Sequence, residues 1–557
     1  MLVSRPPIEQ IQSLSATSAA ASAIPQLSPE EERSRKRQAA RRRKELINFT
    51  VGTFFFAVLV GGVIGLIGGL KAGVGTIAAL LFLPLSYKYP RTALWAFFIY
   101  LPFGGTITYM IGNSPLLQLA KDGLYLPALF GLYQQCRRER QSMFIPKQLL
   151  TPLIILILCC LLTFFSANVY QQFFGADGEK PIAMGILGFK VLIGYAPLIP
   201  CAYYLIRHKK DTFFLMRLSS LLIVICCGLA MVQYLMLLTG KCAGTRFEEG
   251  ADLFKASLEA RCFVGGALLY SPQQGVIRLP GTFVAPWQWG WFLISSTFFG
   301  FASAFSDPKF HGRILGLAAM GLTFVLAVVS GQRIALALVP TVIGLLLLLT
   351  GQVANLKRFI PIGVALGLAL SIAALKNPAT VQERINSFIV RWQASPPDAF
   401  IRGQFFWAMK EGGFLGAGLG RATNSARALG RTELVETYYP KLLYEMGPLG
   451  ALAFFAVVTT LTIVTFKVYR SLRDRNFRGY GAALWVFVLF ISYNTYYYPL
   501  DVDPVAVYYW FFAGVILKLP EVERLAKLEP DAELDEPPDP KQKKRTKKLR
   551  KKKKKRR

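Results

Sequence analysis

From residue 48 onwards the chain repeats one pattern, in which a long apolar run is followed by a short polar connection. A helix that crosses a bilayer needs roughly 20 mostly apolar residues and satisfies its own backbone hydrogen bonds in lipid. The pattern therefore predicts an all-α, polytopic membrane protein of about 14 transmembrane helices, within a range of about 12 to 14. The predicted spans are 48–70, 72–86, 92–110, 115–133, 148–167, 185–206, 216–239, 285–305, 313–330, 334–350, 358–375, 446–467, 480–498 and 504–518.

Lys and Arg gather in every second connection between these spans. Because cytoplasmic loops are enriched in basic residues, this alternation predicts an inner (plasma) membrane protein with both termini in the cytoplasm. The second span is short, and merging it with the first would invert every later loop. The basic connections hold Lys88 and Arg91; Arg137, Arg138, Arg140 and Lys147; Arg207, Lys209, Lys210 and Arg217; Lys309 and Arg313; Lys357 and Arg358; Arg470, Arg473, Arg475 and Arg478.

The composition agrees with a membrane-embedded chain. Of 557 residues, 53% are hydrophobic, and the mean hydropathy is +0.40. Yet 64 Lys and Arg outnumber 32 Asp and Glu, which leaves a formal charge of +32. This combination excludes an ordinary soluble domain, and a disordered chain would lack the apolar residues.

Two polar tails flank the predicted transmembrane domain at 48–519. Residues 1–47 and 520–557 both lack apolar runs and are expected to be disordered and cytoplasmic. In the last 17 residues, 541–557, 14 are Lys or Arg. Such a block could bind anionic lipid headgroups or nucleic acid. We favour lipid and expect no specific nucleic acid, because no RNA-binding motif accompanies the block.

Two predicted external loops, 240–284 and 376–445, are long enough to fold and are where function is expected. The late loop holds several arginines, among them Arg402 and Arg421, on the side where topology does not require basic residues. An anionic ligand is the simplest explanation. The loop also contains a glycine-rich run at 412–420, which lacks the Lys-Ser or Lys-Thr ending of a nucleotide P-loop.

Two further arginines stand beside predicted spans. Arg278 begins the sequence Arg-Leu-Pro-Gly-Thr-Phe, whose Pro and Gly predict a non-helical entry into the next span. Arg333 is the charged residue in the turn between the ninth and tenth spans. It either snorkels to the interface or forms an anion site, since a guanidinium matches phosphate oxygens.

Glu436 and Glu445 are acids of the late loop that could act as a base or orient an arginine, although solvated loop acids are the alternative. His208 and His311 fall in predicted cytoplasmic turns. We therefore expect neither a metal site nor a Ser-His or Cys-His nucleophile on the external side, and no cofactor.

Of eight cysteines, Cys242 and Cys262 share the first external loop. They could pair if that compartment is oxidising, and otherwise they are two free thiols.

Several of these motifs together resemble the O-antigen polymerase and O-antigen ligase superfamily. The resemblance covers roughly 185–470. It is carried by Arg278-Leu-Pro-Gly-Thr-Phe, by Ser330-Gly-Gln-Arg333, and by a late loop with Arg402, Trp407, Gly416-Ala-Gly-Leu-Gly420 and Glu445-Met-Gly-Pro-Leu-Gly450.

The resemblance implies a periplasmic late loop whose arginines hold the diphosphate of a polyprenyl-linked glycan while the sugar passes to a glycan or lipid acceptor. Arg278, Arg333, Arg402 and Arg421 would bind the donor, and Glu436 or Glu445 would assist the acceptor hydroxyl. No metal is needed, because diphosphate is a good leaving group once cations match its charge. Other polysaccharide-assembly proteins are expected partners.

The ligase branch typically carries a late-loop histidine, and this chain has Glu436-Thr-Tyr-Tyr-Pro-Lys-Leu-Leu-Tyr-Glu445 there. This favours a polymerase-like or specialised exopolysaccharide enzyme. The predicted span number and the basic tails resemble cyanobacterial members that act in hormogonium polysaccharide biosynthesis.

A different class remains open, namely a multi-pass transporter of a small anion or solute. Lys121 and Asp122 in the fourth predicted span and Lys190 in the sixth would then line the pathway. Mutual neutralisation of these charges is the alternative explanation.

Overall fold

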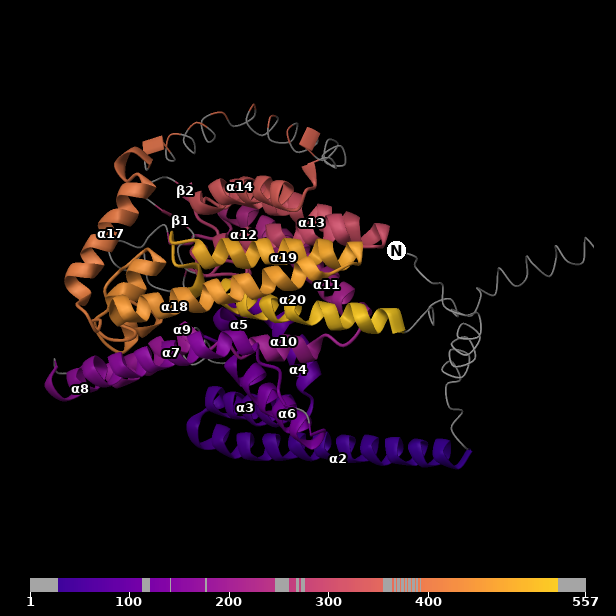
Figure 1. Cartoon of the computed structure of the whole chain (residues 1–557). Helices are drawn as coiled ribbons and strands as arrows, with labels where there is room; N and C mark the ends of the chain where they lie inside the picture. Colours follow the sequence, from indigo (N-terminus) through magenta and orange to yellow (C-terminus); the bar gives the residue numbers. More distant parts are fainter. Residues whose placement is uncertain are drawn as a thin grey trace, which may run out of the picture. The chain divides into compact units, whose positions relative to one another are not determined.

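The computed structural model of the chain (Figure 1) describes residues 29–112, 121–140, 142–175, 178–245, 260–266, 270–271, 276–353 and 392–528, with isolated positions between 363 and 390. It divides into two units, Met1–Leu85 and Ser86–Arg557. The predicted span 358–375 and the polybasic residues 541–557 lie largely or wholly outside the described residues, as does the chain before residue 29.

Unit 1 is a helical hairpin of α2 (Pro29–Gly68) and α3 (Leu70–Lys88). The boundary between the two units, after Leu85, falls within the last turn of α3. Gly69, with φ at +84°, turns the chain between them. The helices approach closely at small residues, since a Cβ on Gly73 would lie 2.7 Å from Cα of Gly65. α2 begins at Pro29 rather than at residue 48, so the helix includes much of the predicted basic tail.

Unit 2 is a helical bundle with one small hairpin, in which β1 (Tyr270–Ser271) pairs with β2 (Val276–Ile277) in antiparallel register. Its described helices are α4 (Pro90–Tyr100), η1 (Leu101–Phe103), α5 (Gly104–Ile111), α6 (Asp122–Arg138), α7 (Lys147–Thr163), η3 (Phe164–Val169), α8 (Tyr170–Phe174), α9 (Pro181–Ile193), α10 (Leu198–Leu205), α11 (Lys209–Leu238), α12 (Pro286–Ser306), α13 (Phe310–Val329), α14 (Arg333–Leu349), α17 (Pro397–Gly412), η7 (Asn424–Ala428), α18 (Tyr438–Ser471), α19 (Arg475–Tyr493), η8 (Pro499–Asp501) and α20 (Val505–Leu528).

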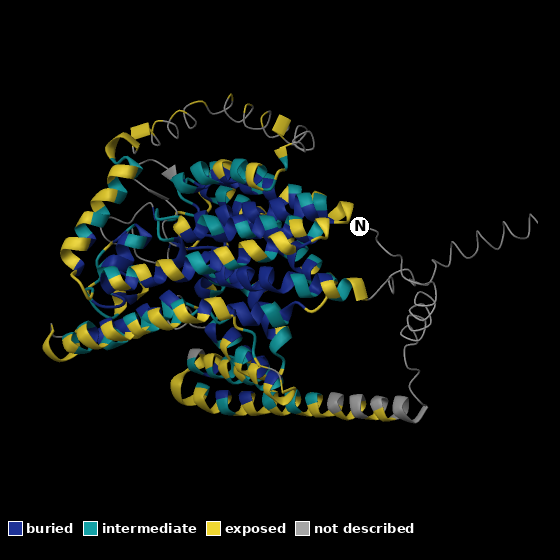
Figure 2. Cartoon of the chain, in the orientation of Figure 1, coloured by how far each residue is buried: buried dark blue, intermediate teal, exposed yellow. Residues whose placement is uncertain are grey.

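Helices α12 and α20 form the core of unit 2 and are buried along most of their length (Figure 2). Residues 505–517 of α20 are uncharged and buried on all sides, as expected of a helix segment surrounded by other helices. Phe299 of α12 lies 4.3 Å from Phe512 of α20, centroid to centroid, and Phe298 contacts Phe487 of α19. Aromatic packing therefore joins three helices that are far apart in sequence.

Eight of the described helices are long and apolar enough to cross a membrane, which supports a multi-pass membrane protein. This criterion gives fewer spans than the predicted 14, partly because some described helices are short or contain polar residues. The eight are Lys44–Gly68, Pro90–Ile111, Lys147–Phe174, Pro181–Leu205, Lys209–Leu238, Phe310–Val329, Tyr438–Ser471 and Val505–Leu528.

The predicted span 185–206 is broken in the structure. α9 ends at Ile193 and α10 begins at Leu198, with a turn at 194–197 between them. Pro197 has no backbone N–H and cannot continue the helical hydrogen-bond ladder. The carbonyl of Gly194 accepts a hydrogen bond of 2.8 Å from the Tyr125 hydroxyl of α6, so a neighbouring helix satisfies the break.

The described basic turns of unit 2 gather at one end of the bundle. Arg91, in the first turn of α4, donates to the Leu205 carbonyl at the end of α10 and to Asp211 at the start of α11. Arg217 of α11 forms two 2.7 Å hydrogen bonds with Asp307 at the end of α12. We call this the basic end, and the opposite end of the same helices the loop end. This grouping agrees with the alternation of basic connections.

Candidate functional site

The glycine-rich run is docked on a kink in α18. Gly447 has φ at +68° and Pro448 lacks an N–H, so the helical bonds to the preceding carbonyls are interrupted. The Ala417 amide donates to the Tyr444 carbonyl at 2.8 Å, and the Gly418 amide donates to the Glu445 carbonyl at 3.2 Å. The Gly-Pro pair in α18 therefore supplies the acceptors that the loop needs.

Asn168, within the π-helical segment η3, anchors the same loop from the other side. Its amide group donates to the carbonyls of Leu419 and Pro181, and its side-chain oxygen accepts from the Leu419 amide at 2.8 Å. The side chain is fully buried. Sequence reasoning missed this residue, for which the available signal was one Asn near the end of a long apolar run.

Arg421 follows the glycine-rich run, and its side chain is 13% exposed. Its guanidinium donates to Gln171 Oε1 at 2.9 and 2.7 Å and to Glu179 Oε2 at 2.7 Å. Burial alone would raise the pKa of Glu179, but hydrogen bonds from the Arg431 amide and Arg421 hold this pKa below its ordinary value. The geometry gives Arg421 a role in fixing the loop, and its donors are engaged by protein groups.

Glu445 is also engaged within the protein. It is 4% exposed, and its Oε1 accepts from the Ala422 amide at 2.8 Å and from the Thr423 hydroxyl at 3.0 Å. One turn away, Lys441 forms a buried 2.8 Å ion pair with Asp501. These contacts favour a structural role for Glu445, whose carboxylate holds the turn at Ala422 and Thr423 after the glycine-rich run.

Glu436 has a different environment, because it is half-buried and sits where three segments meet. Its amide donates to Gln404 Oε1 of α17 at 3.3 Å, and its carbonyl accepts from the Tyr497 amide at 3.0 Å. Its carboxylate interacts electrostatically with the Tyr498 hydroxyl, as does Arg427. The backbone of Glu436 is therefore fixed on both sides.

Tyr498 is the centre of this small cluster. Burial is the largest influence raising its pKa to about 12; the Asn424 hydrogen bond and Arg427 lower it, whereas Asp501 and Glu436 raise it. The Asn424 side-chain amide donates to the hydroxyl at 3.3 Å. The phenol is thus neutral at ordinary pH and able to donate a hydrogen bond.

The segment 494–504 between α19 and α20 was also missed by sequence reasoning. Tyr497 and Tyr498 have φ at +56° and +33°, a left-handed conformation unfavourable for side chains with a Cβ. The Tyr497 carbonyl accepts from Trp291 Nε1 of α12 at 3.0 Å, so the segment links α12 to Glu436. The available signal was three consecutive tyrosines before Pro499 at the end of an apolar run.

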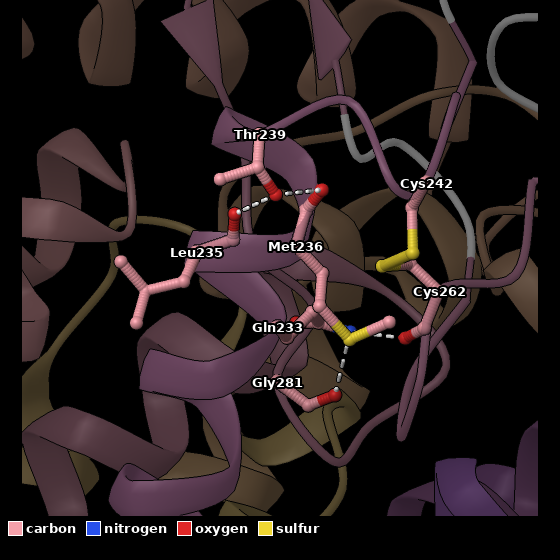
Figure 3. Close-up of a disulfide and its surroundings, with 7 residues drawn as sticks. All are labelled: Gln233, Leu235, Met236, Thr239, Cys242, Cys262 and Gly281. Carbon is pink, nitrogen blue, oxygen red and sulfur yellow. Dashed lines mark hydrogen bonds between the residues drawn. A yellow bond between two sulfur atoms is a disulfide. The ribbon is translucent and has the colours of Figure 1, made fainter.

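A disulfide between Cys242 and Cys262 ties down the first loop (Figure 3). Beside it, Gln233 of α11 donates to the Cys262 carbonyl at 2.9 Å and to the Gly281 carbonyl at 3.4 Å (Figure 3). Gly281 has φ at +56°, and a Cβ there would overlap the ring of Trp289. The segment entering α12 therefore needs glycine at this position.

Arg278 and Arg333 belong to segments that the structure brings together. The Leu279 amide donates to the Ser330 carbonyl at 3.0 Å, and both arginines are half-buried. Each also has an interaction within the protein. The segment with Arg278 and the segment with Arg333, which are separated in sequence by α12 and α13, are thus neighbours at the loop end.

Arg402 lies on α17, which packs on α18 through the stacked rings of Trp407 and Tyr444, 4.9 Å apart. The Arg402 side chain is 70% exposed and forms a 2.6 Å ion pair with Asp398 one turn earlier. A surface pair of this kind contributes at most about 1 kcal/mol, so a ligand could displace it at little cost.

No family model matches this chain, and none of the curated proteins matches it. Among the described residues, no group of three or more His, Cys, Asp or Glu side chains is arranged to hold a metal ion. The described loop end brings arginines, the half-buried carboxylate of Glu436 and the neutral phenol of Tyr498 into one region.

A second polar cluster lies at the break between α9 and α10. Lys190 binds Asp122 at 2.9 Å, and Lys121 pairs with Asp503 of the 494–504 segment. Both ammonium groups lie near the ring of Tyr195, at 5.2 and 5.3 Å from its centroid. The three intramembrane charges singled out in the sequence are thus neighbours, and two lysines balance two aspartates.

Proposed function

We propose that the protein polymerises or transfers polyprenyl-diphosphate-linked glycans at its loop end, in the assembly of a surface or secreted polysaccharide. The observation that carries the proposal is the position of Glu436. It is held between α17, which bears Arg402, and the 494–504 segment, which also contacts α12. The motif arginine Arg278 lies in the segment before α12, and Arg333 begins α14. The two segments are joined by the hydrogen bond from the Leu279 amide to the Ser330 carbonyl.

In this proposal the donor diphosphate lies against Arg278, Arg333 and Arg402, whose guanidinium forks match its oxygens. The acceptor hydroxyl attacks the anomeric carbon, its proton passes to Glu436, and the bond to the diphosphate breaks with its electron pair on the leaving oxygen. Fixed cations stabilise that developing charge. Arg421 and Glu445 keep the glycine-rich run in place and do not touch the substrate.

The decisive experiment incubates the purified protein with an extracted lipid-linked repeat unit, without metal or nucleotide sugar. A ladder of longer glycans supports a polymerase, and a single transfer to an added acceptor supports a ligase. Glu436→Gln should lower the rate by about 10² to 10⁴, as for loss of a general base. The matched control is Glu433→Gln, because Glu433 forms a long surface ion pair with Arg431 and should leave the rate unchanged. Strict dependence on a nucleotide sugar contradicts the proposal.

One observation favours a second candidate function, a transporter. Ionisable residues beside a broken helix are typical of substrate or ion pathways in membranes, and the Lys190–Asp122 and Lys121–Asp503 pairs adjoin the α9–α10 break. Solute uptake by the protein in liposomes free of lipid-linked glycan, lost in Lys190→Met, would favour transport over glycan transfer.

A further inference from the structure

A cavity of about 210 Å³ opens at the basic end of unit 2, at the other end of α13 from Arg333 of the proposed glycan site. It lies where α12 ends, α13 and α19 begin, and the chain leaves α14. At about 30 Å³ per water molecule, it has room for a group of phosphate size. Its polar lining comes from Ser306, Arg313, Gln352, Arg475 and Asn476.

The lining is rich in hydrogen-bond donors and carries positive charge. None of its described lining residues is acidic. The two nearest carboxylates in sequence are engaged elsewhere: Asp307 by Arg217 at 2.7 Å, and Asp474 by the amides that begin α19. Arg313 Nε donates to the Asp307 backbone carbonyl at 2.7 Å, which is a neutral acceptor and leaves the charge of Arg313 in place. The positive charges of Arg313 and Arg475 can therefore attract an anion, and guanidinium groups match phosphate oxygens in geometry.

The surroundings of the cavity are those of a membrane surface. On the first turns of α13, beside Arg313, Phe310 is 70% exposed and Ile314 is 48% exposed. Large apolar side chains directed outwards next to a basic cavity suit a ligand with a charged head and an apolar body. A free phosphate would make no use of them.

We propose that this cavity binds the phosphate group of an anionic phospholipid. The site is built into the helical bundle and is separate from the polybasic segment 541–557, which attracts anionic headgroups by charge alone. The bound lipid would join the ends of α12, α13 and α19. It would hold the bundle at a fixed depth in the leaflet with the most anionic lipid.

The test uses the full-length protein in a neutral detergent, titrated with short-chain phosphatidylglycerol, with phosphatidylcholine of equal chain length, and with inorganic phosphate. Binding is measured by native mass spectrometry and by thermal stabilisation. Phosphatidylglycerol should bind, and phosphatidylcholine should bind about tenfold more weakly, because its choline cation cancels the negative charge of the same phosphate and is repelled by Arg313 and Arg475.

Two variants separate the cavity from general charge attraction. Arg475→Gln and Asn476→Asp should each weaken phosphatidylglycerol binding about tenfold. Both residues lie at the start of α19, where Arg475 is exposed and an added carboxylate is favourable for the helix, so the fold should persist. Arg473→Gln is the matched control, an exposed arginine of the same turn that does not line the cavity. Equal binding by all three variants overturns the proposal, and so does binding of inorganic phosphate without phosphatidylglycerol.

Discussion

Side chains of similar chemistry have different roles at the loop end because their surroundings differ. Arg421 is 13% exposed and bound by Gln171 and Glu179, whereas Arg402 is 70% exposed in a local surface pair. Glu445 is buried against two donors, whereas Glu436 is half-buried and interacts electrostatically with Tyr498. Charge alone marks all four as candidates, and burial decides which ones can meet a ligand.

We expect Arg421→Gln to lower the free energy of unfolding by about 3 kcal/mol, because it removes the charged partner of Glu179 in a partly buried place and leaves that carboxylate with the Arg431 amide. The control is Arg431→Gln, whose side chain is 83% exposed and should change stability little. Thermal unfolding of the purified proteins measures both. Equal melting temperatures for the two variants would contradict the structural role of Arg421.

The same pair should make stability depend on pH. The folded-state pKa of Glu179 is lowered, so the pair contributes fully above the unfolded-state pKa of about 4.3 and is lost as the pH falls through the lower folded-state value. The difference in melting temperature between the parent protein and Arg421→Gln should therefore be constant from pH 7 to about 5 and shrink at more acidic pH. A difference that grows on acidification would exclude this assignment.

At the scale of elements, irregular backbone positions the site. The kink at Gly447 and Pro448 of α18 presents carbonyl acceptors to the glycine-rich run. The break between α9 and α10 admits the Tyr125 hydroxyl. Irregular backbone at membrane depth is tolerated where the protein itself satisfies the polar groups, and both breaks meet this condition.

We expect Gly447→Ala to destabilise the protein strongly, because φ is +68° and the new Cβ would overlap the Phe414 carbonyl oxygen. The strained backbone alone costs about 1 to 3 kcal/mol. Gly403→Ala in α17 is the matched control, since no atom lies within 4 Å of its Cβ position and alanine favours a helix. Thermal unfolding and protease sensitivity of the 412–420 segment report the difference. An unchanged Gly447→Ala protein would show that the kink is dispensable.

At the scale of the whole molecule, the chain separates its charges. The basic turns of unit 2 are joined by ion pairs and hydrogen bonds at one end, and the late loop, the 494–504 segment and the disulfide lie at the other. This arrangement agrees with a chain oriented by its basic connections, with the proposed glycan chemistry outside and the proposed lipid cavity inside.

Cysteine labelling tests that orientation directly. Ala394→Cys and Ser471→Cys introduce thiols at exposed positions of the loop end and the basic end, respectively. In intact cells an impermeant thiol reagent should label Ala394→Cys at once and Ser471→Cys only after permeabilisation. The parent protein is the control for its free cysteines, most of which are buried. Labelling of both positions from the same side would refute the topology.

The sequence by itself determined the membrane class, the approximate places of the helices and the one-sided grouping of basic turns. These features depend on residue character along the chain, because apolar length and basic flanks act locally at each span. The motifs also marked the segments of the loop end, including Arg278, Arg333 and Glu436.

Only the tertiary structure decided which of these residues are engaged. Arg421 meets Glu179 across 242 positions and Lys121 meets Asp503 near the opposite end of the chain, and no local pattern specifies such partners. The break in the sixth predicted span and the strained Tyr497–Tyr498 pair likewise involve neighbouring segments, through the Tyr125 hydroxyl and Trp291 Nε1 respectively. Packing assigns each polar group its partner, because a buried group without one is costly and the available partner is usually distant in sequence.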